Sequence, residues 1–237
     1  MTRHRPTPLL RVAAALVAVP ALLAACTGGG AVPTIPPISE GPATPTPVAT
    51  HPGPTYPAGC PTTQPPALTA DDVRTVTIKT DKGDIAIEVK GSLSPIATGN
   101  FVALADCGYY DGVVFHRVVQ GFVIQGGDGQ FGRSPDVIPD LVGTGGPPYT
   151  IQDEPVTETY GRGVVAMART SQPNSVGSQF FIVLTDDARA PLQDANTYQI
   201  IGKVTSGMEA VDAIAAAADQ ELPTNPVVMT SVTVATP

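Results

Sequence analysis

One cation and two amides stand beside aromatic and aliphatic residues in two short segments of this 237-residue chain. The first reads Phe-His-Arg-Val-Val-Gln-Gly-Phe-Val-Ile-Gln-Gly-Gly-Asp over residues 115–128, and the second reads Asn-Ser-Val-Gly-Ser-Gln-Phe-Phe-Ile over residues 174–182. A guanidinium is always charged and offers several donors in a fixed geometry. Together these groups suit an apolar, neutral ring next to a polar peptide bond, and a proline within a peptide is such a ligand.

Two long motifs in this order, about 50 residues apart, resemble those of the cyclophilins, a family of peptidyl-prolyl cis-trans isomerases. The resemblance covers about residues 73–236 and implies that Arg117 is the catalytic residue. The implied substrate-binding residues are Phe122, Gln125, Met167, Ala168, Arg169, Gln179, Phe181, Leu192 and Tyr198.

The resemblance also assigns roles within this set. A socket for the proline ring is expected from Phe122, Met167, Phe181 and Leu192, with Tyr198 at its edge. The two glutamines are expected to hold the arginine or the substrate backbone. The backbone groups at positions 168 and 169 are expected to bind the residues before the proline.

Isomerisation of an X–Pro bond needs no acid, base or nucleophile. Rotation breaks amide resonance and meets a barrier of ~18–20 kcal/mol, so an enzyme must bind the twisted state better than either planar state. In the twisted state the prolyl nitrogen gains a lone pair that Arg117 is suited to meet with a hydrogen bond. Neighbours on a strand point to opposite faces, so His116 is expected to support the site from behind.

Several positions depart from the family pattern. Pro191 stands where many eukaryotic members carry the tryptophan that is associated with tight cyclosporin binding, and this chain has no tryptophan. Tyr198 replaces a frequent histidine, Arg169 replaces a frequent asparagine, and one extra residue lies between Met167 and Gly177. We therefore expect weak cyclosporin binding, and the preference for the residue before proline stays open.

The N-terminus, residues 1–25, reads as a lipoprotein signal peptide. Three arginines precede an apolar stretch over residues 12–25, which is too short to span a bilayer comfortably. The stretch leads into Leu-Ala-Ala-Cys, which resembles a bacterial lipobox and predicts cleavage before Cys26 with diacylglycerol on its thiol. The alternative is an ordinary secretory signal followed by a chance cysteine.

Residues 26–67 are predicted to be the lipidated cysteine and a linker. Residues 27–67 hold 12 of the 26 prolines with almost no charge, a composition that cannot bury a core. The linker is either unmodified or a glycosylated stalk. Residues 68–237 then form a single domain.

Two further cysteines, Cys60 and Cys107, are an even pair in an exported chain. A disulfide between them is possible, and it would staple the end of the linker to the fold. The alternative is two unrelated thiols.

Hydrophobic periodicity predicts a mainly β domain that positions these side chains. The predicted strands span residues 74–80, 84–90, 113–118, 122–126, 161–168, 180–184, 197–204 and 227–234. One helix is predicted to begin at Pro95 and end at Gly108, and another to run to Ala218 from a capping box at residues 206–209. We expect a closed eight-stranded antiparallel β-barrel capped by two α-helices, which the family resemblance also implies.

Charge and composition exclude several classes of function. The 13 basic residues less Arg3, Arg5 and Arg11 of the signal are 10 against 21 acidic residues, so the mature chain carries −11. This charge argues against nucleic acid and against electrostatic docking on anionic lipid. Only three histidines are present, without ligand spacing, so no metal or other cofactor is expected.

The sequence therefore predicts a monomeric isomerase that is lipid-anchored at the extracytoplasmic side of the cell envelope. Its expected partners are proline-containing segments of unfolded or exported proteins, and the membrane through Cys26. The alternative is a surface-anchored module that binds proline peptides or acts as a chaperone, with incidental isomerase activity.

Overall fold

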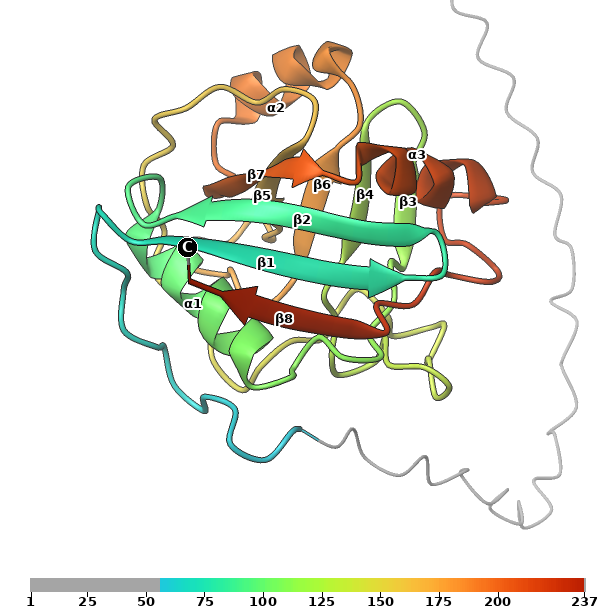
Figure 1. Ribbon diagram of the computed structural model, residues 1–237, viewed down its shortest axis with the longest axis horizontal. Coiled ribbons are helices and arrows are strands. Elements are labelled where there is room, and N and C mark those ends of the chain that lie inside the picture. Colours follow the sequence, from blue (N-terminus) through green and yellow to red (C-terminus); the bar gives the residue numbers. More distant parts are fainter. Residues whose placement is uncertain (1–55, 237) are drawn as a thin grey trace, which may run out of the picture. The chain divides into compact units, whose positions relative to one another are not determined.

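The computed structural model describes residues 56–236 (Figure 1). The predicted signal, Cys26 and the linker up to residue 55 lie outside the described residues, and the predicted domain boundaries stay predictions. Within residues 56–236 no helix is both long enough and apolar enough to cross a bilayer.

Regular structure in this part of the chain comprises eight strands and three helices. The strands are β1 Val73–Thr80, β2 Gly83–Lys90, β3 Arg117–Val119, β4 Val123–Gly126, β5 Val164–Met167, β6 Phe180–Val183, β7 Ile200–Ser206 and β8 Ser231–Ala235. The helices are α1 Pro95–Asp106, α2 Arg189–Ala195 and α3 Met208–Ala217, with a 3-10 turn at Asp186–Ala188 before α2.

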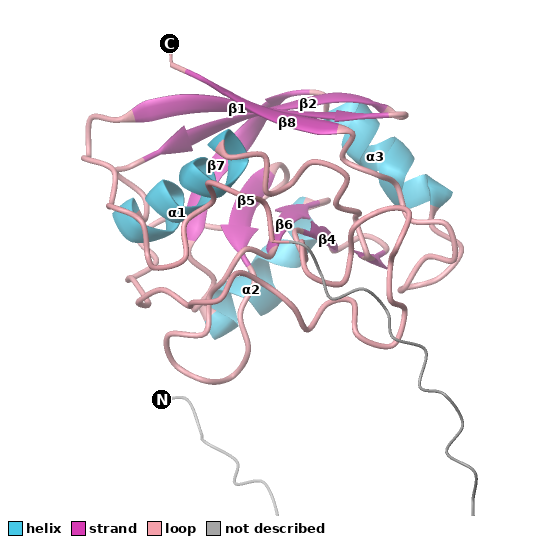
Figure 2. Ribbon diagram, turned by 90° about the horizontal axis from the view of Figure 1, so that it is seen from below, coloured by secondary structure: helices cyan, strands magenta, loops and turns pink. Residues whose placement is uncertain are grey.

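All eight strands belong to one antiparallel sheet with the order β3-β4-β6-β5-β7-β2-β1-β8. The edge strands β3 and β8 do not pair with each other, so the sheet is an open half-barrel and the predicted closed barrel is wrong. The segments expected to close it are mostly irregular and meet in one isolated bridge, between Val114 and Val228. Figure 2 shows β1, β2 and β8 as one layer, with α1 and α3 toward opposite ends of it.

The predicted hairpin over residues 74–90 is confirmed, and it supplies much of the core. Val76 pairs with Ile87 and Ile78 pairs with Ile85, and none of these four side chains has exposed surface. Alternation puts them all on the concave face of the sheet. Burial of each contributes on the order of 1.5–3 kcal/mol to folding, as an upper bound.

The helix starts are stabilised differently from the sequence expectation. Pro95 opens α1 as predicted, but Ser94 makes no side-chain capping bond. The carboxylate of Glu154 instead accepts hydrogen bonds from the amides of Ile96 and Ala97, both at 2.9 Å, and so satisfies two free donors of the first turn.

The predicted capping box of α3 is wrong. The N-cap is Gly207, and no side chain caps the helix. Gly207 has a φ of 89°, and a Cβ there would lie 2.0 Å from the carbonyl oxygen of Asp84. The close approach of β2 therefore selects glycine at this position.

The third helix, α2, was not predicted. It has seven residues, with Pro191 in its first turn, and so offers no helical period long enough to recognise. It carries Leu192, which is buried.

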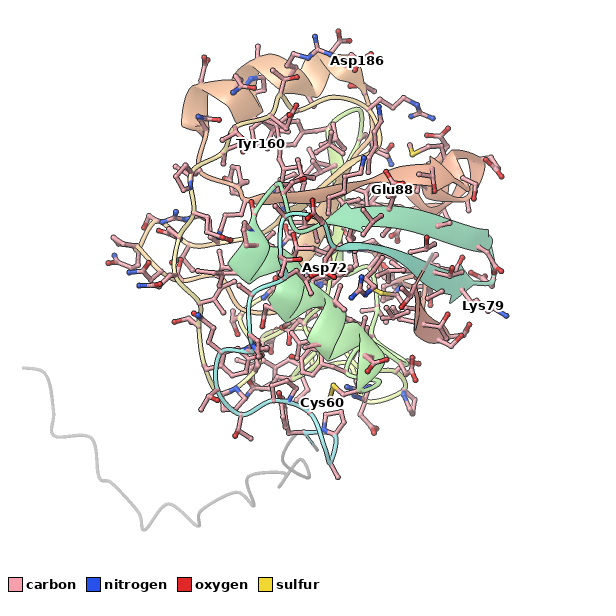
Figure 3. All side chains as sticks on the ribbon, turned by 60° about the vertical axis from the view of Figure 1, so that its left-hand side comes forward. Cys60, Asp72, Lys79, Glu88, Tyr160 and Asp186 are labelled. Atoms are coloured by element: carbon pink, nitrogen blue, oxygen red, sulfur yellow. A yellow bond between two sulfur atoms is a disulfide. The ribbon has the colours of Figure 1, made fainter. Side chains whose placement is uncertain are left out.

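Residues 56–67 fall within the predicted linker, but the structure places them against the domain; we refer to them as the N-terminal strap. A disulfide joins Cys60 to Cys107 at the end of α1 (Figure 3). Further along, Gln64 accepts a hydrogen bond from the amide of Gln152 at 3.2 Å. The strap backbone crosses α1 so closely that a Cβ on Gly99 would lie 2.4 Å from the carbonyl oxygen of Pro66.

Candidate active site

Four neighbouring strands bring the predicted site residues into one row. Arg117 on β3 is the register partner of Gln125 on β4, Gln125 pairs with Phe181 on β6, and Phe181 pairs with Ala166 on β5. Directly paired residues share a face of the sheet. The cation, the amide and the aromatic ring therefore lie side by side, although 64 residue numbers separate Arg117 from Phe181.

A chain of amide hydrogen bonds holds the arginine. Arg117 Nη1 donates to Gln125 Oε1 at 3.4 Å, and Gln125 Nε2 donates to Gln179 Oε1 at 2.9 Å. Gln179 Nε2 donates in turn to the carbonyl oxygens of Gly143 and Gly145, both at 2.9 Å. Because a carbonyl can only accept, these last two bonds fix the orientation of both amides, and an oxygen faces Arg117.

The loop that supplies those carbonyls is organised by Asp128, which is fully buried. Its carboxylate accepts hydrogen bonds from the amides of Gln130 at 3.0 Å and Phe131 at 2.9 Å. It also accepts from the amides of Gly143 at 2.7 Å and Gly145 at 2.9 Å. Four donors compensate the burial of this charge and hold both ends of the loop together.

Arg117 has a second partner, which sequence reasoning missed. Its Nε donates to Glu221 Oε1 at 2.7 Å, from the segment that follows α3. The arginine side chain is 37% exposed, and within residues 56–236 no hydrogen bond uses Nη2. One edge of the guanidinium is thus available to a ligand.

A cluster of apolar side chains lies beside this polar row, and we call it the socket cluster. Its buried members include Val123, Ala166, Phe181 and Leu192, and Phe122, Ala168 and Tyr198 are partly exposed. The rings of Phe181 and Tyr198 pack edge to face with centroids 5.3 Å apart. Tyr160, which lies beneath α2 (Figure 3), donates its hydroxyl to the backbone carbonyl oxygen of Tyr198 at 2.7 Å and so holds the backbone that carries that ring.

The structure separates Met167 from the other predicted socket residues. Met167 has no exposed surface and belongs to the interior cluster, the apolar core between the sheet and α1. Alternate residues of β5 face opposite sides, so Ala166 and Ala168 reach the socket and Met167 cannot. Val123, which was not predicted, lies in the socket next to Phe122.

The polar groups of Ala168 and Arg169, the next two predicted residues, are largely occupied by hydrogen bonds within the protein. The amide of Ala168 donates to the carbonyl oxygen of Gln179 at 2.8 Å, so its own carbonyl is the group left for a ligand. The Arg169 side chain is 12% exposed, pairs with Asp153 at 2.9 Å and donates to the carbonyl oxygen of Gln172 at 2.8 Å. Arg169 therefore stabilises the loop to which it belongs. Both residues border a groove of about 460 Å³ that Gln125 and Gln179 also line.

His116 lies behind the site, as expected. It is 4% exposed, and neither ring nitrogen has a hydrogen-bond partner among the residues described. Burial lowers the pKa of His116, and Arg117 lowers it further, against an opposing effect of the Asp128 carboxylate. The imidazole is therefore neutral at neutral pH. From its place behind the site it cannot contact a ligand in the socket.

This arrangement places apolar surface suited to a small ring beside one always-charged donor. It contains no nucleophile paired with a base. Those are the requirements for an enzyme that isomerises the peptide bond before proline by binding its twisted state.

Comparison with known proteins agrees with this class. Residues 75–234 match the family model described as "Cyclophilin type peptidyl-prolyl cis-trans isomerase/CLD". The chain belongs to the cyclophilin family of peptidyl-prolyl cis-trans isomerases and is an isomerase enzyme.

Relatives and solved structures extend over most of the domain. A probable peptidyl-prolyl cis-trans isomerase of Brucella abortus is 41% identical over 157 residues, which cover 65% of this chain and 78% of the relative. One from Streptomyces antibioticus is 35% identical over 168 residues, covering 66% and 96%. A crystal structure of a Cryptosporidium parvum cyclophilin, determined in the presence of the dipeptide Ala-Pro, has a TM-score of 0.57 at 31% identity and covers 69% of this chain and 99% of that one.

Proposed function

We propose that this isomerase acts on X–Pro bonds of exported polypeptides at the cell envelope, to which a lipid on Cys26 anchors it. The observation that carries the catalytic part is the free edge of the Arg117 guanidinium beside the socket cluster. The Ala-Pro dipeptide that accompanies the Cryptosporidium structure supports a proline peptide as the substrate.

Binding begins with the proline ring in the socket. Phe122 and Phe181 offer apolar surface, and Leu192 provides it from the side of α2. These contacts are the same for the cis, trans and twisted forms, so they contribute mainly to KM. The groove beside Gln125 and Gln179 takes the residues next to the proline.

Rate enhancement then comes from Arg117. As the bond twists, the prolyl nitrogen becomes a hydrogen-bond acceptor, and the guanidinium donates to it from the edge of an apolar socket, where the interaction is stronger than in water. Each ~1.4 kcal/mol of preference for the twisted state is worth tenfold in rate. The bonds to Gln125 and Glu221 hold the donor before the substrate arrives.

The envelope location rests on the N-terminus and on the disulfide. The lipobox-like residues 23–26 motivate the anchor. The Cys60–Cys107 disulfide is typical of a protein that matures outside the reducing cytosol. Intact-mass spectrometry should find diacylglycerol on Cys26 of the mature chain, and Cys26→Ala should release the protein from membranes. An unlipidated chain that begins at another residue would overturn the anchor.

The catalytic proposal is tested by an isomerisation time course on a short proline peptide. Arg117→Ala should lower kcat/KM by about ten- to a hundredfold, equivalent to ~1.4–2.7 kcal/mol, because the twisted state loses its donor. Arg117→Lys should restore little, since one rotating ammonium cannot replace a planar fork. Thermal unfolding should barely change, because the side chain is partly exposed.

Full activity in Arg117→Ala would refute the arginine mechanism. If the wild-type protein instead binds the same peptide tightly but isomerises it negligibly, its physiological role would be that of a proline-peptide-binding or chaperone module.

A further inference from the structure

Glu221, which lies outside the two sequence motifs, is the charged residue nearest to the Arg117 guanidinium. It lies 104 residues beyond Arg117 in the chain, and its Oε1 is 2.7 Å from Arg117 Nε. The two side chains are 58% and 37% exposed, so the pair lies at the surface of the site.

The backbone around Glu221 is fixed on the strand that carries the arginine. The amide of Val118, the residue after Arg117, donates to the carbonyl oxygen of Glu221 at 2.8 Å. Gln120 donates from the same strand region to the carbonyl oxygen of Ala215 at 2.5 Å. These bonds fasten the segment after α3 to β3 and place the Glu221 side chain next to Arg117.

The turn that presents Glu221 is also held internally. The Asp219 carboxylate accepts a hydrogen bond from the amide of Thr224 at 2.9 Å, which closes the loop around Glu221. Hydrogen bonds from Thr224 lower the pKa of Asp219, so the carboxylate is ionised at neutral pH. The side chain of Glu221 is thus delivered by a loop fixed at both ends.

Two acceptors on different nitrogens define the plane of a guanidinium. Gln125 accepts from Nη1 and Glu221 accepts from Nε, so Arg117 cannot rotate about its last bonds without losing one of them. An arginine that is partly exposed and held by only one weak 3.4 Å bond would sample many rotamers. We propose that Glu221 is a positioning residue, which holds the Arg117 guanidinium in the plane from which Nη2 meets the twisted prolyl nitrogen.

This inference rests on the proposed role of Arg117, and its effect is bounded by the strength of an exposed ion pair. Such pairs contribute about 0.2–1 kcal/mol, so Glu221→Gln should lower kcat by about 1.4- to fivefold. KM should stay unchanged, because the socket still binds the proline ring. Glu221→Asp should recover part of the loss, since it keeps the charge on a side chain one methylene shorter.

Asp212→Asn is the matched control. Asp212 pairs with Arg162 at 2.7 Å, with side chains 53% and 39% exposed, and neither residue contacts the site. Both substitutions remove one exposed acid and change the net charge equally. Asp212→Asn should leave kcat and KM of an uncharged proline peptide unaltered, and both variants should keep the wild-type unfolding temperature to within a few degrees.

Salt and a double variant complete the test. Screening weakens an exposed ion pair, so raising the salt concentration should lower wild-type kcat toward that of Glu221→Gln, whose own kcat should stay flat. Arg117→Ala combined with Glu221→Gln should be no slower than Arg117→Ala alone.

If Arg117→Ala is slow but Glu221→Gln has a kcat equal to or above that of the wild type, the role of Glu221 is refuted. An active Arg117→Ala would refute the mechanism itself.

Discussion

Phe180 and Phe181 are neighbours on β6, yet they belong to two different regions of the molecule. Phe180 has no exposed surface and packs against three aromatic rings of the interior cluster, those of Phe101, Tyr110 and Phe115. Phe181 faces the socket cluster and packs against one ring, that of Tyr198. One strand thus divides two tasks between its faces, because the interior cluster stabilises the fold and the socket cluster binds the ligand.

The largest expected effect is a direct test of this division. Phe180→Ala should lower the free energy of unfolding by about 3–5 kcal/mol, because it leaves a cavity among packed rings. Phe181→Ala should destabilise less, since this ring packs against one other ring rather than three, and it should raise KM for a proline peptide. Urea unfolding and steady-state kinetics of both variants are the measurements. If Phe181→Ala loses as much stability as Phe180→Ala and keeps the wild-type KM, the two faces of β6 do not differ in task.

A second test loosens the interior side only. Cys60 belongs to the interior cluster and Cys107 packs against it. Cys60→Ser combined with Cys107→Ser should lower the free energy of unfolding by about 2–4 kcal/mol, because the unfolded chain regains the freedom of a long loop. Kinetics well below the unfolding temperature should match wild type. A raised KM in the folded double variant would show that the strap also serves the socket.

A third test sharpens the socket side. Pro191 is exposed in the first turn of α2, next to the buried Leu192. Pro191→Trp should tighten cyclosporin inhibition by about tenfold, or ~1.4 kcal/mol, by adding an aromatic face at the rim of the socket. Inhibition constants of both proteins, with Asp212→Asn as a surface control, measure the effect. A wild-type enzyme that cyclosporin already inhibits strongly would show that the missing indole is unimportant.

The smallest effect concerns pH. Because the pKa of His116 is lowered in the fold, the unfolded state binds its proton first as the pH falls below about 6.5. Stability should therefore decline on acidification from that point, and less so in His116→Gln. Activity should stay flat from about pH 6 to 8, since no group of the mechanism titrates there. An activity titration near neutral pH that His116→Gln removes would make His116 the catalytic candidate.

Sequence patterns located most of the sheet and most of the socket, for reasons that are local. The alternation in β1 and β2 is a period of two with a turn between, which predicts both strands and their buried face. The two motifs lie on β3, β4 and β6, which the sheet brings together, so Arg117, Gln125 and Phe181 meet as expected.

What could not be predicted depends on contacts between distant segments. Glu221 follows a helix that ends 98 residues after β3, in a loop with no pattern of its own. Glu154 caps α1 from 58 residues away. Met167 was assigned to the socket by the family resemblance, although the period of two on β5 already separates it from Ala166 and Ala168. The sheet stays open because the segments 113–118 and 227–234, predicted as strands, are largely irregular and meet in one isolated bridge.

The position of the disulfide has a mechanical consequence. Any pull on the N-terminal segment enters the fold at Cys60 and passes through a covalent bond to Cys107, at the end of α1. Without that bond the same pull would detach the rest of the strap, reach Val73 and then separate β1 from β2 and β8, one hydrogen bond at a time. The bond redirects tension from a zipper of strand pairs to the end of a helix. The domain can thus bear load at its N-terminal side without opening its sheet.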